Sequence, residues 1–433
     1  MSFNRREFLK LLGAAGVTGL VGSSLTGCST AQATPHVVIV GGGIGGSTAA
    51  KYLRFADPGV KITLIDPAKE YLTCLRSSDV IVGHVKIEEI TFTHATLRDE
   101  YGVNIVQEKV IGLDATKREV STESGTKIGY DRLIVAPGID FRWDAIEGYS
   151  QEASTTTMPH GWKAGPQTLL LKQQLEAMPP GGLYVMVAPP NPYRCPPGPY
   201  ERASLIAEYF KKNNPTAKIL VLDPKDAFTK QAAFIKGWER LYGYGTDQSI
   251  LEWVSGAQGG TVLSVDPKSK SLKTDFEDYQ ADAVNFIPAQ KAPQLVYDMG
   301  LTDESGWCPV DRRSFESSLV PNVHVIGDSC IADAMPKSGY SANSQAKVTA
   351  QAIADLMAGR EPGEPSLLNV CVSLVGVDYG ISVAAIYKLI DGKIGSVADS
   401  GGVSPITDSP AQPLLESIYQ PNWHRTFAKD VFA

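Results

Sequence analysis

The chain has 433 residues, of which 43% are hydrophobic, 8% aromatic and 20% charged. This is the composition of a globular protein, and the length leaves room for two or three domains. Forty Lys and Arg against forty-seven Asp and Glu give a net charge of −7, without the basic excess that nucleic-acid binding requires. Six cysteines exclude a disulfide-built miniprotein, and the six histidines show no spacing typical of a metal site.

The first 33 residues are expected to be a targeting signal rather than part of the fold. Arg5 and Arg6 precede a Gly- and Ala-rich stretch, residues 11–35, that has no charged side chain. This pattern resembles a twin-arginine signal, and its glycines disfavour a membrane-spanning anchor. Two forms of processing are open: cleavage after Ala33, or lipidation of Cys28. Both predict a periplasmic protein, anchored to a membrane only if Cys28 is lipidated.

A nucleotide-binding motif follows directly. Residues 36–40 form a short β-branched run, typical of a buried parallel strand, that leads into Gly41, Gly43 and Gly46. These three glycines make a G-x-G-x-x-G pattern, which gives a tight turn and lets the backbone approach a pyrophosphate. A second β run ends at Asp66, where an acid can bind a ribose hydroxyl. The segment therefore predicts a dinucleotide-binding domain.

Two later segments favour flavin over nicotinamide. Residues 130–138 resemble the strand and loop that leave the first domain of flavoproteins with two dinucleotide domains. Residues 323–328 resemble the late FAD motif of these proteins, in which a strand ends at Gly327 and Asp328 and the carboxylate holds the ribityl chain. FAD is therefore the predicted cofactor.

The middle of the chain repeats the strand–turn–helix pattern of the first domain but lacks its glycines. Strands are predicted at residues 183–188 and 218–222, with a helix at 203–211, as in a second Rossmann unit. The intervening loop, residues 189–199, is rich in proline, which has no N–H to donate to a phosphate. The second domain is expected to keep its architecture and to have lost NAD, so electrons should enter from the substrate.

Longer strings carry a resemblance to a known family. They are similar to the flavoprotein subunit of flavocytochrome c sulfide dehydrogenase, and they occur at residues 161–165, 194–204, 237–243, 306–311 and 336–345. The resemblance extends over nearly the whole chain. It implies an α/β fold with two Rossmann-like dinucleotide-binding domains, as in glutathione reductase, and a C-terminal interface domain.

The implied domain organisation has an FAD domain in two parts. The expected parts are a signal segment at 1–33, the FAD domain at 34–150 and 290–360, the second domain with a degenerate NAD site at 151–289, and a C-terminal domain at 361–433. Aromatic residues of this last part, Tyr379, Tyr387, Tyr419 and Trp423, could supply an interface with a partner, and a small satellite core is an equal alternative.

The resemblance implies roles for three cysteines. Cys74 matches the family cysteine that holds the flavin through a thioether, and a buried, inert thiol is the alternative. Cys195 and Cys371 match the pair that forms a redox-active disulfide beside the flavin, and a purely structural bridge is the alternative. Cys308 and Cys330 have no such match and are expected to pack as small apolar side chains.

Two polar residues correspond to groups around the family's sulfide site, Glu201 and Tyr340. Glu201 could take a proton from bound sulfide if burial raises its pKa. An ion pair with Arg194 or Arg202 is an equal alternative for this carboxylate. The sequence alone does not decide between them.

A predicted helix start adds a charge effect near the flavin. Lys337, Ser338 and Gly339 are expected to open a helix. The positive N-terminal end of such a helix would stabilise negative charge on the flavin pyrimidine when the cofactor is reduced.

The resemblance implies an FAD-dependent sulfide:cytochrome c oxidoreductase. Sulfide would be oxidised to sulfur or polysulfide through the disulfide and FAD, and the electrons would pass to a cytochrome c subunit in a heterodimer. The chain has no C-x-x-C-H sequence and so attaches no c-type haem itself. The alternative is an enzyme that resembles sulfide:quinone oxidoreductases and delivers electrons to membrane quinone. Residues 423–433 have mixed charges and no long apolar face, which favours the cytochrome.

Overall fold

The computed structural model of the protein describes residues 34–433. The predicted signal segment, with Cys28 and Ala33, lies outside the described residues. Contacts group Pro35–Ala433 into one compact unit, so the domain boundaries expected within it stay predictions. Within residues 34–433, none of the helices combines the length and apolar character needed to cross a membrane.

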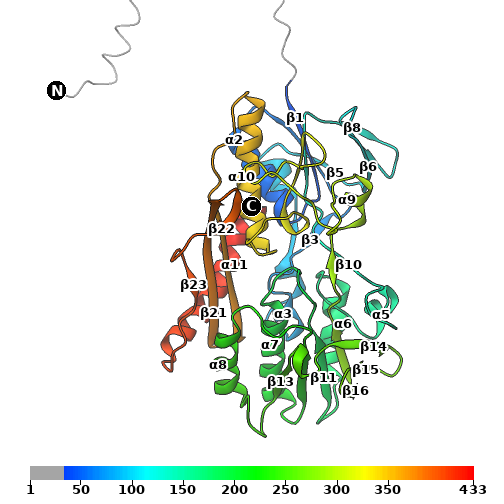
Figure 1. The fold of residues 1–433 in the computed structure, drawn as a ribbon, viewed down its shortest axis with the longest axis vertical. Helices are drawn as coiled ribbons and strands as arrows, with labels where there is room; N and C mark the ends of the chain where they lie inside the picture. Colours follow the sequence, from blue (N-terminus) through cyan, green and yellow to red (C-terminus); the bar gives the residue numbers. More distant parts are fainter. Residues whose placement is uncertain (1–33) are drawn as a thin grey trace, which may run out of the picture. The chain divides into compact units, whose positions relative to one another are not determined.

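The first sheet is parallel and joins distant parts of the chain (Figure 1). Its strand order is β19-β9-β1-β2-β5. These strands are β1 (His36–Val40), β2 (Lys61–Ile65), β5 (Asn104–Val106), β9 (Arg132–Val135) and β19 (Val323–Val325). Two long helices, α2 (Ile44–Ala56) and α10 (Gly339–Met357), pack against each other beside it. The first Rossmann-like domain predicted from the sequence is confirmed.

The turn between β1 and α2 depends on its glycines. Gly41 has a φ of 98°, a conformation that glycine adopts without strain. A Cβ at Gly46 would lie only 1.8 Å from the carbonyl oxygen of Gly41. The close approach of helix to strand therefore requires glycine at position 46.

The second sheet has the order β13-β12-β11-β17 and is also parallel. It contains β11 (Leu183–Val187), β12 (Lys218–Leu222), β13 (Leu251–Val254) and β17 (Ala283–Phe286), with α6 (Pro166–Glu176), α7 (Gly198–Asn213) and α8 (Gln231–Tyr242) around it. The predicted strands are confirmed. The helix expected at 203–211 begins earlier, at Gly198, because proline at position 199 is compatible with a first helical turn.

The carboxylate that follows β12 is hydrogen-bonded by other side chains of the protein. Asp223 is fully buried, and its two oxygens accept hydrogen bonds from Tyr200, Trp253 and Lys225. The ring of Tyr200 in turn stacks on Phe228, with 3.6 Å between ring centres. In a Rossmann unit, the acid at this position would bind a nucleotide ribose. Here both oxygens of that acid accept hydrogen bonds from the protein's own side chains. This arrangement agrees with the expected loss of NAD binding.

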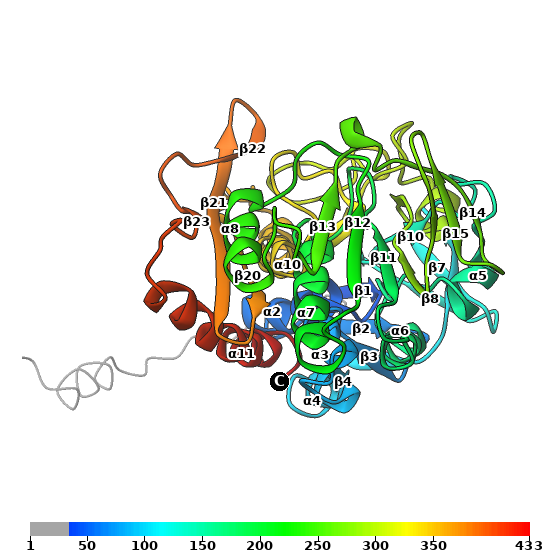
Figure 2. The same cartoon turned by 90° about the horizontal axis from the view of Figure 1, so that it is seen from below.

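The C-terminal part adds an antiparallel sheet and a long helix. The sheet contains β20 (Leu367–Gly376), β21 (Tyr379–Ile390), β22 (Lys393–Ser396) and β23 (Gly402–Val403), and the helix is α11 (Ala411–Phe432). Figure 2 shows α7 and α8 beside this sheet, and both helices pack against β20. Strand β20 also packs against α10, so the C-terminal part contacts helices of both Rossmann-like units.

The second half of α11 is anchored on the first domain. Phe427, Val431 and Phe432 are buried, and Lys51 of α2 donates hydrogen bonds to backbone carbonyls at the C-terminus. Asn343 of α10 donates to the carboxylate of Asp430, 2.8 Å away. This half forms a core with the FAD domain, as the satellite-core alternative expected.

The first half of α11 has a different environment. Leu414, Leu415, Ile418 and Tyr419 are between 41% and 54% exposed. The absence of an apolar face in residues 423–433 therefore carries little weight for the acceptor, because that stretch is anchored in the protein and the exposed apolar residues lie just before it.

Shorter elements fill the connections. Before residue 150 these are β3 (Glu70–Leu72), α3 (Ser77–Ile81), a 3₁₀ turn (Ile87–Ile90), β4 (Thr91–Thr93), α4 (Ala95–Asp99), β6 (Val110–Asp114), β7 (Glu119–Thr122), β8 (Lys127–Gly129) and β10 (Asp140–Phe141). The later ones are α5 (Gln151–Thr156), a 3₁₀ turn (Gly256–Gln258), β14 (Val262–Asp266), β15 (Ser271–Thr274), β16 (Asp278–Gln280), β18 (Gln290–Lys291), α9 (Gln294–Asp298) and a 3₁₀ turn (Gly327–Ser329).

Candidate active site

A large cavity, which we call the nucleotide cavity, lies at the carboxyl ends of the first sheet and has a volume of about 550 Å³. It brings together the predicted flavin-binding segments, and its lining includes Gly41, Gly43, Asp66, Cys74, Gly138, Gly327, Asp328 and Gly339. Gly46 does not line it but packs against Gly41. Lys337 and Ser338 line an adjoining cavity of about 450 Å³ that also contacts Gly327.

Two side chains hold the glycine-rich turn in place. The carboxylate of Asp66 accepts a hydrogen bond from the backbone N–H of Gly42 and a second one from that of Ala68. The ring of His94 lies 2.8 Å from the carbonyl oxygen of Gly42. Sequence analysis did not single out His94, because its position in the chain has no link to the glycine motif. A Cβ at Gly42 would collide with this ring, which shows how tightly the turn is packed.

Asp328 presents a free polar atom to the nucleotide cavity. Its side chain is buried, burial raises its pKa, and its Oδ1 has no hydrogen-bond partner among the described residues. Such an atom is costly unless a ligand satisfies it. A ribityl hydroxyl is the donor that the late FAD motif predicts here. The glycine-rich turn and this unsatisfied carboxyl oxygen together fit FAD.

The residues before α10 support the same region. Ser338 caps the helix by accepting a hydrogen bond from the N–H of Ser341, so the predicted helix start is confirmed. The ammonium of Lys337 donates to the carbonyl oxygens of Asp328 and Cys330, at 2.6 and 3.0 Å. It also lies 3.8 Å from the ring centre of Trp307. Lys337 thus fixes the loop that carries Asp328.

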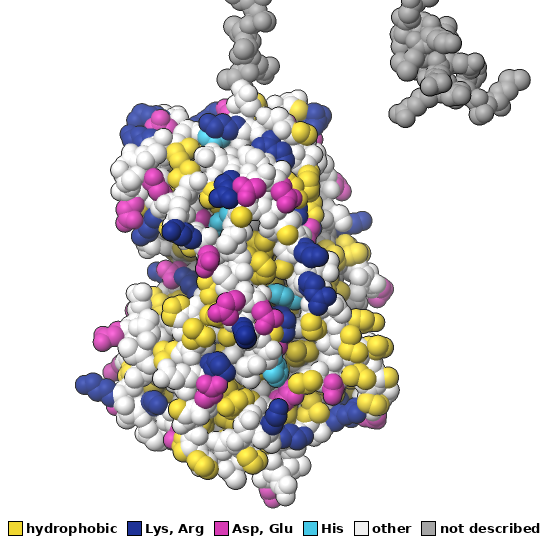
Figure 3. All heavy atoms as spheres, turned by 180° about the vertical axis from the view of Figure 1, so that it is seen from behind, with side chains coloured by type: hydrophobic (Ala, Val, Ile, Leu, Met, Phe, Trp, Pro, Cys, Tyr) yellow, Lys and Arg dark blue, Asp and Glu magenta, His cyan; other side chains and the backbone are white. Residues whose placement is uncertain are grey.

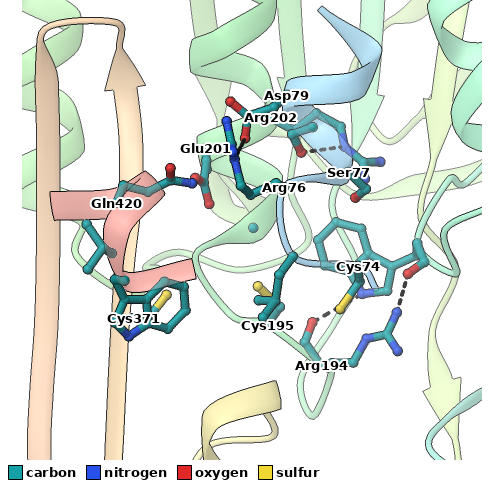
Figure 4. Close-up of a pocket in the computed structure, with 16 residues that line it drawn as sticks. Cys74, Arg76, Ser77, Asp79, Arg194, Cys195, Glu201, Arg202, Cys371 and Gln420 are labelled. Carbon is teal, nitrogen blue, oxygen red and sulfur yellow. Dashed lines mark hydrogen bonds and ion pairs between the residues drawn. The ribbon is translucent and has the colours of Figure 1, made fainter. Parts of the chain in front are cut away.

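A second, smaller cavity of about 60 Å³ contains the three cysteines that the family resemblance singled out (Figure 4). Cys74, Cys195 and Cys371 all line this cysteine cavity, and in Figure 4 Cys195 is drawn between the other two. Cys74 and Arg194 line both the cysteine cavity and the nucleotide cavity. None of the three sulfurs is bonded to another cysteine in this structure.

The loop before α7 gives Cys195 an unusual backbone. Its φ is 59°, in the left-handed region, which for a residue other than glycine is a strain typical of functional sites. Its N–H donates to the carbonyl oxygen of Lys337 at 2.8 Å, and its own carbonyl accepts from Gly198 at 2.9 Å. A Cβ at Gly198 would lie 2.7 Å from the Trp162 ring and 3.1 Å from the Cys195 sulfur. Only glycine leaves room for this thiol.

Glu201 stands in the first turn of α7 at the wall of the cysteine cavity. Burial raises its pKa to about 7, although the N–H of Leu374, which donates to Oε1 at 3.0 Å, favours the carboxylate. Among the described residues it pairs with neither arginine. The guanidinium of Arg202 donates to the carbonyls of His160 and Gly161 and to Asn285, and that of Arg194 donates to the carbonyl of Trp162.

Other polar atoms of the cysteine cavity are left without partners. Within residues 34–433, Gln420 Oε1, Trp423 Nε1 and Arg194 Nε are buried without a hydrogen-bond partner, and all three residues line this cavity. They suit a small polar or anionic ligand. Tyr340 does not line the cavity but stacks on Trp423, with 6.2 Å between ring centres. The sequence did not place Gln420 or Trp423 at this site, because both residues reach the cavity only through the docking of α11, and it considered Arg194 only as a possible ion-pair partner of Glu201.

The two remaining described cysteines are buried beside each other. The backbones of Cys308 and Cys330 pair in an isolated parallel β-bridge, without a bond between their sulfurs. Burial raises the pKa of each thiol to about 12. Neither lines the cysteine cavity. Cys308 is fully buried, as expected of a small apolar side chain, whereas the Cys330 thiol also donates to Gln345 Oε1 at 3.4 Å and lines the cavity that adjoins the nucleotide cavity.

Three family models match successive parts of the chain. Residues 35–162 match the pyridine nucleotide-disulphide oxidoreductase model. Residues 168–288 match the central region of the sulfide dehydrogenase (flavocytochrome c) flavoprotein chain. Residues 363–432, which include Cys371 and α11, match the flavin-binding model of flavocytochrome c sulphide dehydrogenase.

Among individual proteins, sulfide-quinone reductases match most of the chain, and a sulfide dehydrogenase flavoprotein chain matches a short part of it. The sulfide-quinone reductase of Aquifex aeolicus is 25% identical over 373 residues, which are 81% of this chain and 83% of that protein. The X-ray structure of the sulfide:quinone oxidoreductase from Aquifex aeolicus shares the fold, with a TM-score of 0.71 and 20% identity over 92% of this chain and 93% of that one. The sulfide dehydrogenase flavoprotein chain of Chlorobaculum thiosulfatiphilum is 49% identical over 47 residues, which are 11% of this chain and 98% of that protein. The chain described here belongs to the family of the flavocytochrome c sulfide dehydrogenase flavoprotein chain.

Proposed function

We propose that the protein oxidises sulfide to sulfur or polysulfide at Cys195 and Cys371 and passes the electrons to a c-type cytochrome subunit. One observation carries the proposal. Cys195 and Cys371, which lie far apart in the sequence, line one small cavity together with Cys74, which also lines the nucleotide cavity.

The size and polarity of the cysteine cavity support a substrate of very few atoms. About 60 Å³ is room for hydrosulfide but not for a peptide thiol such as glutathione. The unpartnered atoms of Gln420, Trp423 and Arg194 provide donors and an acceptor for an anion with one proton. Glu201, with a pKa of about 7, suits the removal of a proton from neutral hydrogen sulfide.

The chemistry proposed for the two cysteines is thiol–disulfide exchange. In the oxidised protein a disulfide would join Cys195 and Cys371, and hydrosulfide would attack one sulfur and expel the other as a thiolate. The products are a cysteine persulfide and a thiolate, which together hold the two electrons lost by sulfide. FAD, when bound, supplies a two-electron acceptor next to this pair. Arg194 and Cys74, at the junction of the cavities, would orient the cofactor's reactive end.

A cytochrome acceptor is favoured by family membership, and a quinone acceptor is the second candidate. The chain has no haem-attachment sequence of its own, so a cytochrome would have to be a partner. The relative from Aquifex aeolicus, which matches over 373 residues, is named a sulfide-quinone reductase. The exposed apolar residues of α11 would suit either a partner surface or a membrane surface. Figure 3 shows one face of the molecule, on which hydrophobic side chains are interspersed with charged ones.

Replacement of Cys195 tests the disulfide role. Cys195→Ser should lower the rate at which sulfide bleaches the flavin absorbance by about a thousandfold or more, because no disulfide can form. The flavin should remain bound, since Cys195 does not line the nucleotide cavity. Stopped-flow absorbance measures both, and Cys308→Ala is the matched control with normal bleaching. Normal bleaching in Cys195→Ser would refute the proposed chemistry.

The acceptor can be identified with sulfide-reduced protein. Rapid mixing with a soluble c-type cytochrome should give haem reduction much faster than mixing with a short-chain quinone gives quinol. Absorbance changes of haem and quinone report the two rates, and Cys195→Ser corrects for direct reduction by sulfide. Fast quinone reduction without any haem reduction would replace the cytochrome by the quinone.

A thioether between Cys74 and the flavin is part of the proposal. Flavin should then stay with the protein after acid precipitation, and peptide mass spectrometry should find it on the peptide containing Cys74. Cys74→Ala should release its flavin under the same treatment, whereas Cys330→Ala should not. Release of flavin from the unaltered protein would show that the attachment is noncovalent.

The raised pKa of Glu201 predicts a pH dependence. The side chain is a neutral acid below about pH 7 and a carboxylate above it, so its capacity to accept a proton rises as the pH passes through 7. The bleaching rate at saturating sulfide should rise over the same interval. Glu201→Gln should lack this rise, so that its bleaching rate at high pH is about tenfold lower. Free sulfide titrates identically for both proteins, so their ratio isolates the enzyme group. Glu208→Gln, on the same helix but outside the cavity, is the control, and an unchanged profile in Glu201→Gln would exclude this base.

A further inference from the structure

A buried lysine stands behind Cys371. Lys230 is only 5% exposed, and its Nζ donates to Ser373 Oγ at 2.8 Å and reaches the carbonyl oxygen of Ile381 at 3.4 Å. None of the ion pairs among residues 34–433 includes it. A buried ammonium without a carboxylate at contact distance is costly unless another anion compensates it. The charge of Lys230 favours the carboxylate of Glu201 and the thiolate of Cys371, and no sequence motif singles out this lysine.

Ser373 connects the lysine to the cysteine. Cys371 and Ser373 are two residues apart on β20, so their side chains lie on the same face of the strand. The Ser373 oxygen lies 4.0 Å from the Cys371 sulfur. Since this oxygen accepts a hydrogen bond from Lys230, its own hydroxyl proton can be donated to a thiolate at Cys371, and Glu201 is the other acceptor within its reach.

The groups that face the two cysteines differ. Cys371 faces Lys230, which favours its thiolate, and Glu201, which opposes it. Cys195 faces Cys371, Cys74 and Glu201, all of which oppose its thiolate more strongly than Arg194 favours it. Burial raises the pKa of both thiols. The only cation joined to either sulfur through a hydroxyl, among the described residues, is thus on the Cys371 side.

We propose that Lys230, acting through Ser373, is a positioning residue that holds Cys371 as the thiolate released when the Cys195–Cys371 disulfide opens. The inference rests on the proposed function. In the step, hydrosulfide attacks Cys195, a bond forms between the sulfide sulfur and the Cys195 sulfur, and the bond to Cys371 breaks. The electron pair of the broken bond stays on Cys371. The sulfide sulfur is oxidised, the disulfide is reduced, and hydrosulfide keeps its proton on the Cys195 persulfide.

Alkylation of the reduced holoprotein tests the assignment without sulfide. Iodoacetamide reacts with thiolates, so the pH dependence of modification, measured peptide by peptide by mass spectrometry, reports each thiol separately. Lys230→Met should slow modification of Cys371 about tenfold at neutral pH. Loss of one nearby positive charge should raise the pKa of the thiol by about one unit or more, which lowers the fraction present as thiolate. Cys195 should change little. Lys230→Arg should restore the Cys371 rate, and an unchanged Cys371 profile in Lys230→Met would overturn the proposal.

Two further variants separate other causes. Ser373→Ala keeps the lysine but removes the connecting hydroxyl, and it should slow Cys371 in the same direction; normal Cys371 reactivity there would overturn the relay. The measurements are repeated in a Glu201→Gln background, so that titration of Glu201 does not contribute. Lys236→Met is the control for loss of a positive charge, because Lys236 is a partly exposed lysine on α8, the helix that follows Lys230, and pairs with Asp408. Thermal unfolding shows whether each variant is folded.

Reaction with sulfide completes the test. Oxidised protein is mixed with one equivalent of sulfide without an electron acceptor, and persulfides are trapped by alkylation and located by mass spectrometry. A persulfide on Cys195 supports the proposal, and a persulfide on Cys371 overturns it. If neither cysteine gains sulfur, the sulfide function fails, and the alkylation profiles still decide whether Lys230 controls Cys371.

Discussion

The active site depends on how one loop is fixed between two domains. The proline-rich loop before α7 belongs to the second sheet, yet the N–H of Cys195 donates to the carbonyl of Lys337 in the segment that opens α10. This bond and the left-handed backbone at Cys195 fix the position of Cys195 at the cysteine cavity. Lys337 is itself tied to the carbonyl of Asp328. A single chain of contacts therefore couples the thiol to the residue that presents an unsatisfied oxygen to the nucleotide cavity.

The second Rossmann-like domain has changed its chemistry while keeping its sheet. Its acid, Asp223, is buried under Tyr200 and Trp253, and its turn offers prolines where a pyrophosphate would need N–H groups. The space that a nicotinamide nucleotide would require is thereby given to protein side chains. The helix that follows carries Glu201 into the cysteine cavity instead. The loop and helix that follow the first strand of this sheet thus bring a thiol and a carboxyl group to the cysteine cavity.

The C-terminal part closes the site from two sides. Strand β20 brings Cys371 and Ser373, and α11 brings Gln420 and Trp423. Each of these residues is remote in sequence from the flavin motifs. The cavity they complete is small, and unpartnered polar atoms line it. The buried ammonium of Lys230 adds an asymmetry between the two thiols that neither cysteine has by itself.

The sequence by itself determined the two sheets, the FAD motif and the family, because glycine spacing and β-branched runs act through local geometry. It also named Cys195 and Cys371, but only by resemblance. The tertiary structure alone decided that these thiols share a cavity, that Glu201 is buried without an arginine partner, and that Lys230 stands behind Cys371. Burial and contact across distant segments depend on how helices and sheets dock, and no local pattern in the chain encodes that.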